Sequence, residues 1–91
     1  MSGPVWSLAA LEVLSLFSTG RRMHGYAVCK ETGHKEPTIY TILGRLEQQG
    51  LLRSEIDRGV PSVSARIPRV VYEMTTLGTD QITAIRAIIA Q

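Results

Sequence analysis

Cysteine is almost absent from this chain, and so are long uncharged apolar runs. Cys29 is the one cysteine among 91 residues, which excludes an internal disulfide and any zinc site built on paired cysteines. No apolar run approaches the roughly 20 residues that a membrane-spanning helix needs. Residues 1–18 are apolar, but they lack the basic start of a signal peptide and contain Glu12. We therefore expect a cytoplasmic protein that does not bind a membrane.

Patterns for catalysis and for metal binding are also missing. His24, Cys29 and His34 follow one another at a spacing that matches no common set of metal ligands. Nothing in the sequence places a base and an orienting acid near a serine or threonine nucleophile. We expect no metal, no cofactor and no enzymatic activity. His24 is instead predicted to cap or pack at the start of a helix, and Cys29 to be a small buried residue or, alternatively, a redox sensor.

The charge of the chain is small but unevenly distributed. A net charge of +2 is weak support for a nucleic-acid partner. Residues 21–69, however, contain nine basic and five acidic residues, whereas residues 1–20 contain only Glu12 and residues 70–91 carry a net charge of −1. Basic residues therefore gather between two apolar ends, which favours either a nucleic-acid surface or a merely solvated one. Arg21 and Arg22 are open to both interpretations.

The clearest local pattern is an amphipathic helix over residues 37–49. Its apolar residues recur at helical spacing on one stripe, and they are Ile39, Ile42, Leu43 and Leu46. Pro37 suits the first turn, where its missing N–H is not needed, and Gly50 suits the position just after the end. The opposite face is small, polar or basic, as expected of a helix that is held firmly while another molecule meets its free side.

Other segments supply the elements around this helix. Residues 7–18 predict a helix that is apolar nearly all round, and residues 24–32 predict a shorter one. Residues 51–57 and 69–74 predict two strands of a hairpin with a loose basic tip. A last helix is predicted from Thr75 or Thr76 to the end of the chain, with its first turn weakened by Gly78. Its apolar stripe comprises Leu77, Ile82, Ile85, Ile88 and Ile89.

This order of elements predicts a winged helix-turn-helix of the α+β class, mostly α. We expect one domain over residues 1–91, made of a winged-helix core (1–75) and a terminal dimerisation helix (76–91). The helix 37–49 would enter the major groove of DNA, which admits one α-helix, and the wing 57–69 would lie beside the duplex. Thr38, Thr41 and Gln48 can donate hydrogen bonds to DNA, and Arg45 can contact a guanine.

Four short motifs, in this order, resemble those of the PadR-like family of bacterial transcriptional regulators. They are His24-Gly25-Tyr26-Ala27, Thr38-Ile39-Tyr40, the run from Leu43 to Leu52 (LGRLEQQGLL), and the run from Pro68 to Thr75 (PRVVYEMT). The resemblance implies a winged-helix repressor or local regulator that dimerises through its first and last helices. It also implies that Thr38 and Tyr40 contact the DNA backbone and that Arg69 braces the wing or contacts DNA from it.

The chain departs from the family pattern at two positions of the predicted reading helix. Pro37 stands where the family usually has glycine, and Thr41 stands where it often has proline. Pro37 removes a backbone N–H that would otherwise serve a phosphate. A longer terminal dimerisation domain, found in many relatives, is also absent from this sequence.

The sequence therefore predicts a transcriptional regulator that binds a pseudo-palindromic operator in double-stranded DNA as a homodimer. A small-molecule effector is possible and unidentified. The alternative is a winged-helix module that binds another protein, which the low net charge would suit. The predicted DNA-binding residues are Lys35, Thr38, Tyr40, Thr41, Arg45, Gln48, Arg58, Arg66 and Arg69. The predicted dimer-interface residues are Leu8, Leu11, Phe17, Ile82, Ile85 and Ile89.

Overall fold

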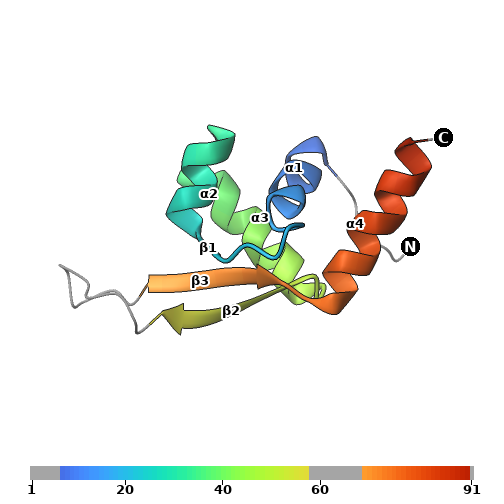
Figure 1. Cartoon of the computed structure of the whole chain (residues 1–91). Helices are drawn as coiled ribbons and strands as arrows, with labels where there is room; N and C mark the ends of the chain where they lie inside the picture. The colour runs from blue at the N-terminus through green and yellow to red at the C-terminus, as the bar shows by residue number, and fades with distance from the viewer. Residues whose placement is uncertain (1–6, 58–68, 91) are drawn as a thin grey trace.

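The computed structural model describes residues 7–57 and 69–90, which form helices packed against one side of a small sheet (Figure 1). The elements are α1 (Leu8–Leu16), β1 (Met23–His24), α2 (Gly25–Thr32), α3 (Glu36–Gln48), β2 (Leu52–Asp57), β3 (Arg69–Met74) and α4 (Thr76–Ile89). The α+β class and the order of helices and hairpin strands predicted from the sequence are confirmed. No helix in this described part is long and apolar enough to cross a membrane.

α1 and α4 begin where a polar side chain satisfies one of their first backbone N–H groups, whereas the N-cap residues of α2 and α3 form no side-chain hydrogen bond of this kind. The Ser7 hydroxyl accepts a hydrogen bond from the Ala10 N–H at 3.1 Å, and the Thr75 hydroxyl accepts one from the Gly78 N–H at 3.0 Å. α1 ends at Leu16 rather than at the predicted residue 18, because residues 17–19 form a turn. The predicted helix 37–49 lies one residue earlier, at Glu36–Gln48.

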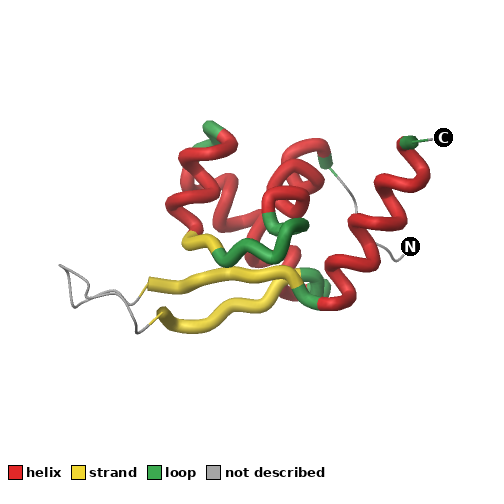
Figure 2. The backbone as a smooth tube through the Cα atoms, in the orientation of Figure 1, coloured by secondary structure: helices red, strands yellow, loops and turns green. Residues whose placement is uncertain are grey.

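The sheet has one more strand than the predicted hairpin. β1 pairs antiparallel with β3 through Met23 and Tyr72 and through His24 and Val71, so that β3 lies between β1 and β2 (Figure 2). A strand of two residues is too short to show the period-2 alternation that reveals longer strands in a sequence. β2 and β3 pair from Leu52 opposite Met74 to Asp57 opposite Arg69. The predicted basic tip, with Arg58 and Arg66, lies outside the described residues.

The core lies between α1, α2, α3 and the sheet. The whole apolar stripe of α3, Ile39, Ile42, Leu43 and Leu46, is buried there as predicted. Phe17 (0% exposed) and Ile82 (5% exposed) also belong to this core. Both side chains, predicted to contact a second subunit, are covered by their own chain in this structure. Of the other predicted interface residues, Leu11 and Ile85 are half-buried, and Leu8 and Ile89 are exposed.

The first turn of α4 is held against the loop between α3 and β2. The Thr75 hydroxyl donates to the Gly50 carbonyl at 2.6 Å, and the Thr75 N–H donates to the Leu51 carbonyl at 3.1 Å. Gly78 is buried at this contact, where a Cβ would collide with the Leu51 carbonyl oxygen and come within 2.8 Å of Met74 Cγ. Gly78 is therefore required by packing, although its sequence position suggested only a weakened helix.

We expect Gly78→Ala to lower the free energy of unfolding by about 1–3 kcal/mol, because the added methyl group must push α4 away from backbone atoms that cannot yield. Urea-induced unfolding at a fixed protein concentration measures the change. Thr83→Ala, at an exposed position of the same helix, is the control and should alter stability by no more than about 0.5 kcal/mol. Equal stability of the two variants would contradict this account of Gly78.

Candidate nucleic-acid interface

The face of α3 opposite its buried stripe is open to solvent. Pro37, Thr41, Gly44, Arg45 and Gln48 are all exposed on it. The four buried residues of the stripe hold the helix in place, and each contributes roughly 1.5–3 kcal/mol of hydrophobic stabilisation. α3 is therefore a helix fixed on one side and free on the other, which is the arrangement needed to enter a DNA groove.

Thr41 has its hydroxyl proton engaged inside the helix. Its Oγ1 donates to the Pro37 carbonyl at 2.8 Å, one turn earlier. Thr41 is predicted from the sequence to donate to DNA, whereas in the structure its hydroxyl proton is already in use. What remains for a partner is the γ-methyl group and the acceptor lone pairs of Oγ1.

Most described basic side chains are paired within the chain. Arg21 binds Glu31 at 2.6 Å, Arg22 binds Glu55 and lies 3.8 Å from Glu73, and Arg53 binds Glu73 at 2.7 Å. The hydrogen bond from Arg21 lowers the pKa of the Glu31 carboxyl. Arg86 donates to the Ser18 hydroxyl, and Lys30 lies over the ring of Tyr26. Arg21 and Arg22 are thus engaged in ion pairs, which weakens their interpretation as a phosphate clamp.

Three described basic side chains have no such partner within residues 7–57 and 69–90. They are Lys35, which precedes α3, Arg45 on its open face, and Arg69 at the start of β3. All three are exposed, and all three are predicted DNA-binding residues. The pairing pattern therefore leaves positive charge free along α3 and at the base of the wing, while it neutralises arginines elsewhere.

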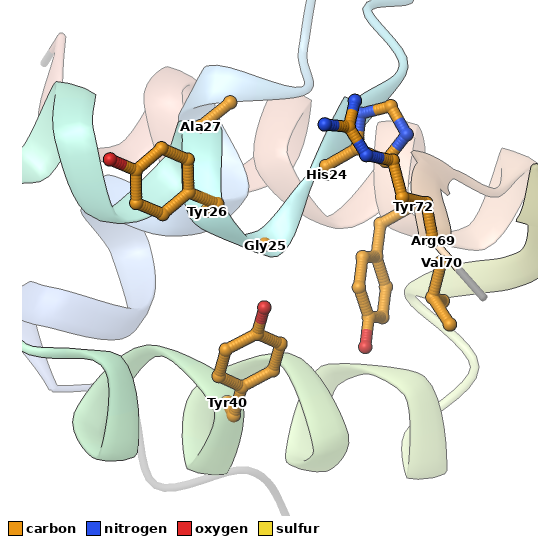
Figure 3. Close-up of a pocket in the computed structure, with 8 residues that line it drawn as sticks. All are labelled: His24, Gly25, Tyr26, Ala27, Tyr40, Arg69, Val70 and Tyr72. Atoms are coloured by element: carbon orange, nitrogen blue, oxygen red, sulfur yellow. The ribbon is translucent and has the colours of Figure 1, made fainter. Parts of the chain in front are cut away.

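Tyr40 lies on the flank of α3 that faces α2 and the sheet. Together with residues of α2 and β3 it lines a hollow of about 560 Å³, which also includes Arg69 and Tyr72. The Tyr40 hydroxyl points toward Gly25 at the start of α2 (Figure 3). A Cβ at Gly25 would lie only 2.6–2.7 Å from Tyr40 ring and hydroxyl atoms. Gly25 thus leaves the space in which the Tyr40 ring sits.

The environment of Tyr40 favours the protonated form of its hydroxyl still further than in a free tyrosine. Partial burial, followed by the neighbouring Cys29 and Glu36, raises the pKa of Tyr40 above its ordinary value of 10. At neutral pH the side chain is therefore an uncharged hydrogen-bond donor, which suits contact with a phosphate oxygen. Tyr40 is about half exposed (47%), so it can reach a partner from the edge of the hollow.

His24 is the residue that begins α2, but its side chain does not cap the helix. The His24 Nε2 lies 3.1 Å from Asp57 Oδ2 and so links the start of α2 to the end of β2. The side chain of His24, the N-cap residue, therefore accepts no hydrogen bond from the first N–H groups of α2. Sequence reasoning identified His24 as a start-of-helix residue, but it missed the link to Asp57, because the two residues are 33 positions apart.

A second hollow borders the other flank of α3. Ser7 and Ala9 at the start of α1 share this hollow of about 440 Å³ with Thr38, Thr41 and Arg45. The sequence analysis assigned α1 only to a dimer interface. The structure places the beginning of α1 beside the predicted reading residues as well, a proximity that no local pattern reveals.

Cys29 is buried, as expected, and burial raises the pKa of its thiol. A raised pKa lowers the thiolate fraction and with it the reactivity that a redox sensor needs. Within the described residues, no three His, Cys, Asp or Glu side chains lie close enough together to hold a metal ion.

The remaining exposed apolar surface includes the outer side of α4. Leu77, Ile88 and Ile89 are exposed there by roughly half to three quarters, and Leu8 is 84% exposed at the start of α1. The helix itself stands beside the core rather than within it (Figure 1). Leu77 and Ile88 were predicted to lie on the apolar stripe of this helix but were not among the predicted interface residues. Ile82, which is buried, was among them.

Residues 13–84 match the sequence profile of the transcriptional regulator PadR-like family. A PadR-family transcriptional regulator from Eggerthella lenta DSM 2243 is 31% identical, with a TM-score of 0.72 over 89% of this chain and 70% of that one. A PadR-family regulator from Clostridium difficile R20291 is 22% identical, with the same TM-score over 89% of this chain and 85% of that one.

The complex of Staphylococcus aureus MepR with DNA contains a similar fold. It is 19% identical, with a TM-score of 0.77 over 92% of this chain and 64% of the MepR chain. At this identity the likeness shows the winged-helix fold and nothing more. A search of curated proteins finds no match.

Gly25→Ala should displace the Tyr40 ring from its place beside α2, because the new methyl group would overlap the ring. We expect the pKa of Tyr40, which lies above 10 in the native protein, to fall toward 10 as the ring gains solvent. A pH titration by NMR of protein labelled at the tyrosine ring measures this, with Tyr40→Phe to assign the signal. An unchanged Tyr40 titration in Gly25→Ala would show that the ring does not depend on this glycine.

Proposed function

Because this chain belongs to the PadR-like family of transcriptional regulators, we propose that it binds a specific operator in double-stranded DNA with α3 in the major groove. Members of the family regulate transcription and are not enzymes. The observation that supports this most directly is the free positive charge of Lys35, Arg45 and Arg69 around the open face of α3. Phosphates are the partners that unpaired basic side chains on one face attract most strongly.

On the open face, Arg45 is the residue best suited to read a base. Its guanidinium is exposed and unpaired within the described chain, and arginine forms two parallel hydrogen bonds with guanine O6 and N7. Thr41 presents a methyl group, which suits contact with the methyl of thymine. Gln48 lies one turn beyond Gly44 and can pair with adenine, and Thr38 faces the flank near α1.

The hollow beside Tyr40 is proposed to hold a backbone phosphate. The start of α2 presents uncapped N–H groups and the positive end of the helix dipole there. The neutral Tyr40 hydroxyl adds a donor, and Arg69 adds a charge from the sheet side of the same hollow. Arg58 and Arg66 of the wing are proposed to add salt-sensitive contacts, and both lie outside the described residues.

We propose that two copies of the chain bind together. The exposed apolar residues Leu77, Ile88 and Ile89 of α4 would be covered in such a dimer, which adds buried area to a small domain. A two-fold dimer would read a pseudo-palindromic operator with half-sites about one helical turn apart. A dimer seated on a promoter excludes other proteins from the same DNA, so repression in the cytoplasm is the proposed outcome.

Arg45→Ala should cost about 1–3 kcal/mol of binding to an operator selected from a random DNA pool, and much less of binding to random duplex. Fluorescence anisotropy at several salt concentrations measures both affinities. Arg53→Ala is the matched control, because Arg53 is paired with Glu73. The next residue, Ser54, hydrogen-bonds Glu47 of α3. Since successive side chains of a strand point to opposite faces, Arg53 lies on the face of the sheet away from α3. Wild-type operator affinity in Arg45→Ala would contradict the assigned face, and a flat salt response of the native protein would favour the protein-binding alternative.

Ile88→Asp should produce a monomer, because the proposed interface would have to bury a charge without a partner. Sedimentation equilibrium at micromolar concentration measures the mass, and operator titration should show weakened binding. Thr83→Asp, which adds the same charge at an exposed polar position of α4, should remain dimeric. A monomeric native protein, or a dimeric Ile88→Asp variant, would argue against this surface.

A further inference from the structure

Gly44 lies near the middle of α3, where no feature of the described residues requires a glycine. A helix interior is destabilised by glycine relative to alanine, because glycine loses more backbone freedom on folding. Gly44 has ordinary helical backbone angles. A Cβ built at this position meets nothing within 4 Å. Alanine would therefore fit the folded chain at Gly44 and make α3 more stable.

The other described glycines differ from Gly44 in this respect. Gly20, Gly33 and Gly50 have positive φ angles between 76° and 80°, and Gly25 and Gly78 are approached too closely for a Cβ. Each of these five is explained by the fold of a single chain. Within residues 7–57 and 69–90, Gly44 is thus the one glycine without an internal explanation, and the reason for it must be sought in what α3 meets.

The position of Gly44 on the helix indicates what that is. Thr41 and Gln48 lie three residues before and four residues after it, so the three share the open face opposite the buried stripe. The unpaired Arg45 is next to it in the chain. Because Thr41 turns its hydroxyl proton back to Pro37, its short side chain stays close to the helix backbone on this face.

We propose that Gly44 is a specificity-determining residue, at which the α3 backbone comes closest to the base edges in the major groove. This inference rests on the proposed DNA-binding function. Without a side chain at Gly44, the helix sits deeper in the groove, so that the short Thr41 side chain and the Arg45 guanidinium reach the bases together. Any side chain at this position would lift α3 and lengthen both contacts, whereas phosphate contacts at Lys35 and Arg69 tolerate the shift.

The test is a graded series, Gly44→Ala and Gly44→Leu, in the full chain. We expect Gly44→Ala to raise the Tm by about 3–6 °C, since alanine restores helix propensity in open space. Affinity for the selected operator should nevertheless fall by about tenfold, and further in Gly44→Leu, comparable with the loss from a mismatched base pair. Binding to random duplex of equal length should change by less than about twofold, because phosphate contacts dominate it.

Two controls separate this inference from the function on which it rests. Thr83→Ala at an exposed position of α4 also introduces alanine into a helix and should leave operator affinity unchanged, so a general effect of such a substitution cannot explain a loss. Arg45→Ala reports whether the α3 face reads DNA at all. If Arg45→Ala weakens operator binding while both Gly44 variants bind as well as the native protein or better, the inference is overturned and the function stands. If the native protein selects no operator, the proposed function itself fails.

Discussion

The burial of one stripe of α3 is the constraint on which the rest of this molecule depends. Ile39, Ile42, Leu43 and Leu46 are enclosed by α1, α2 and the sheet, and this holds the helix at a fixed depth and rotation. A helix packed on a close-packed core does not turn about its axis. The residues between the stripe positions therefore point to solvent in a fixed arrangement. The open face of α3 presents a defined surface because the buried face cannot move relative to the core.

The distribution of charge around that fixed helix depends on which basic side chains form ion pairs, and not on a large net positive charge. The net charge of +2 is small, yet Arg21, Arg22 and Arg53 are each balanced by a glutamate. Lys35, Arg45 and Arg69 have no acidic partner among the residues that the structure describes. Exposed ion pairs contribute little stability. Their consequence here is a contrast in local charge, because the basic side chains left unpaired among the described residues lie along α3 and at the base of the wing. A long-range attraction to a polyanion would act on this face of the molecule.

Much of the fold and part of the site were predictable from local pattern. The helices, the two long strands and the buried stripe follow from periodicity and turn residues, and Lys35, Thr38, Tyr40, Arg45 and Gln48 are exposed around the predicted reading helix. β1 was not predictable, because two residues carry no period. The burial of Phe17 and Ile82 within the chain was not predicted, because an apolar helical stripe does not indicate which neighbour covers it. Their own chain encloses both.

The sequence by itself determined which segments are helical, which side of α3 is apolar, and that basic residues gather between two apolar ends, because each of these depends only on neighbours within a few turns. Tertiary structure alone decided which arginines are neutralised, how His24 meets Asp57, and why Gly25 and Gly78 leave no room for a side chain. A Cβ at Gly25 or Gly78 would meet atoms of residues distant in the chain, whereas a Cβ at Gly44 meets nothing within 4 Å among the described residues. Such distances arise only when remote segments pack together, so no local pattern encodes them.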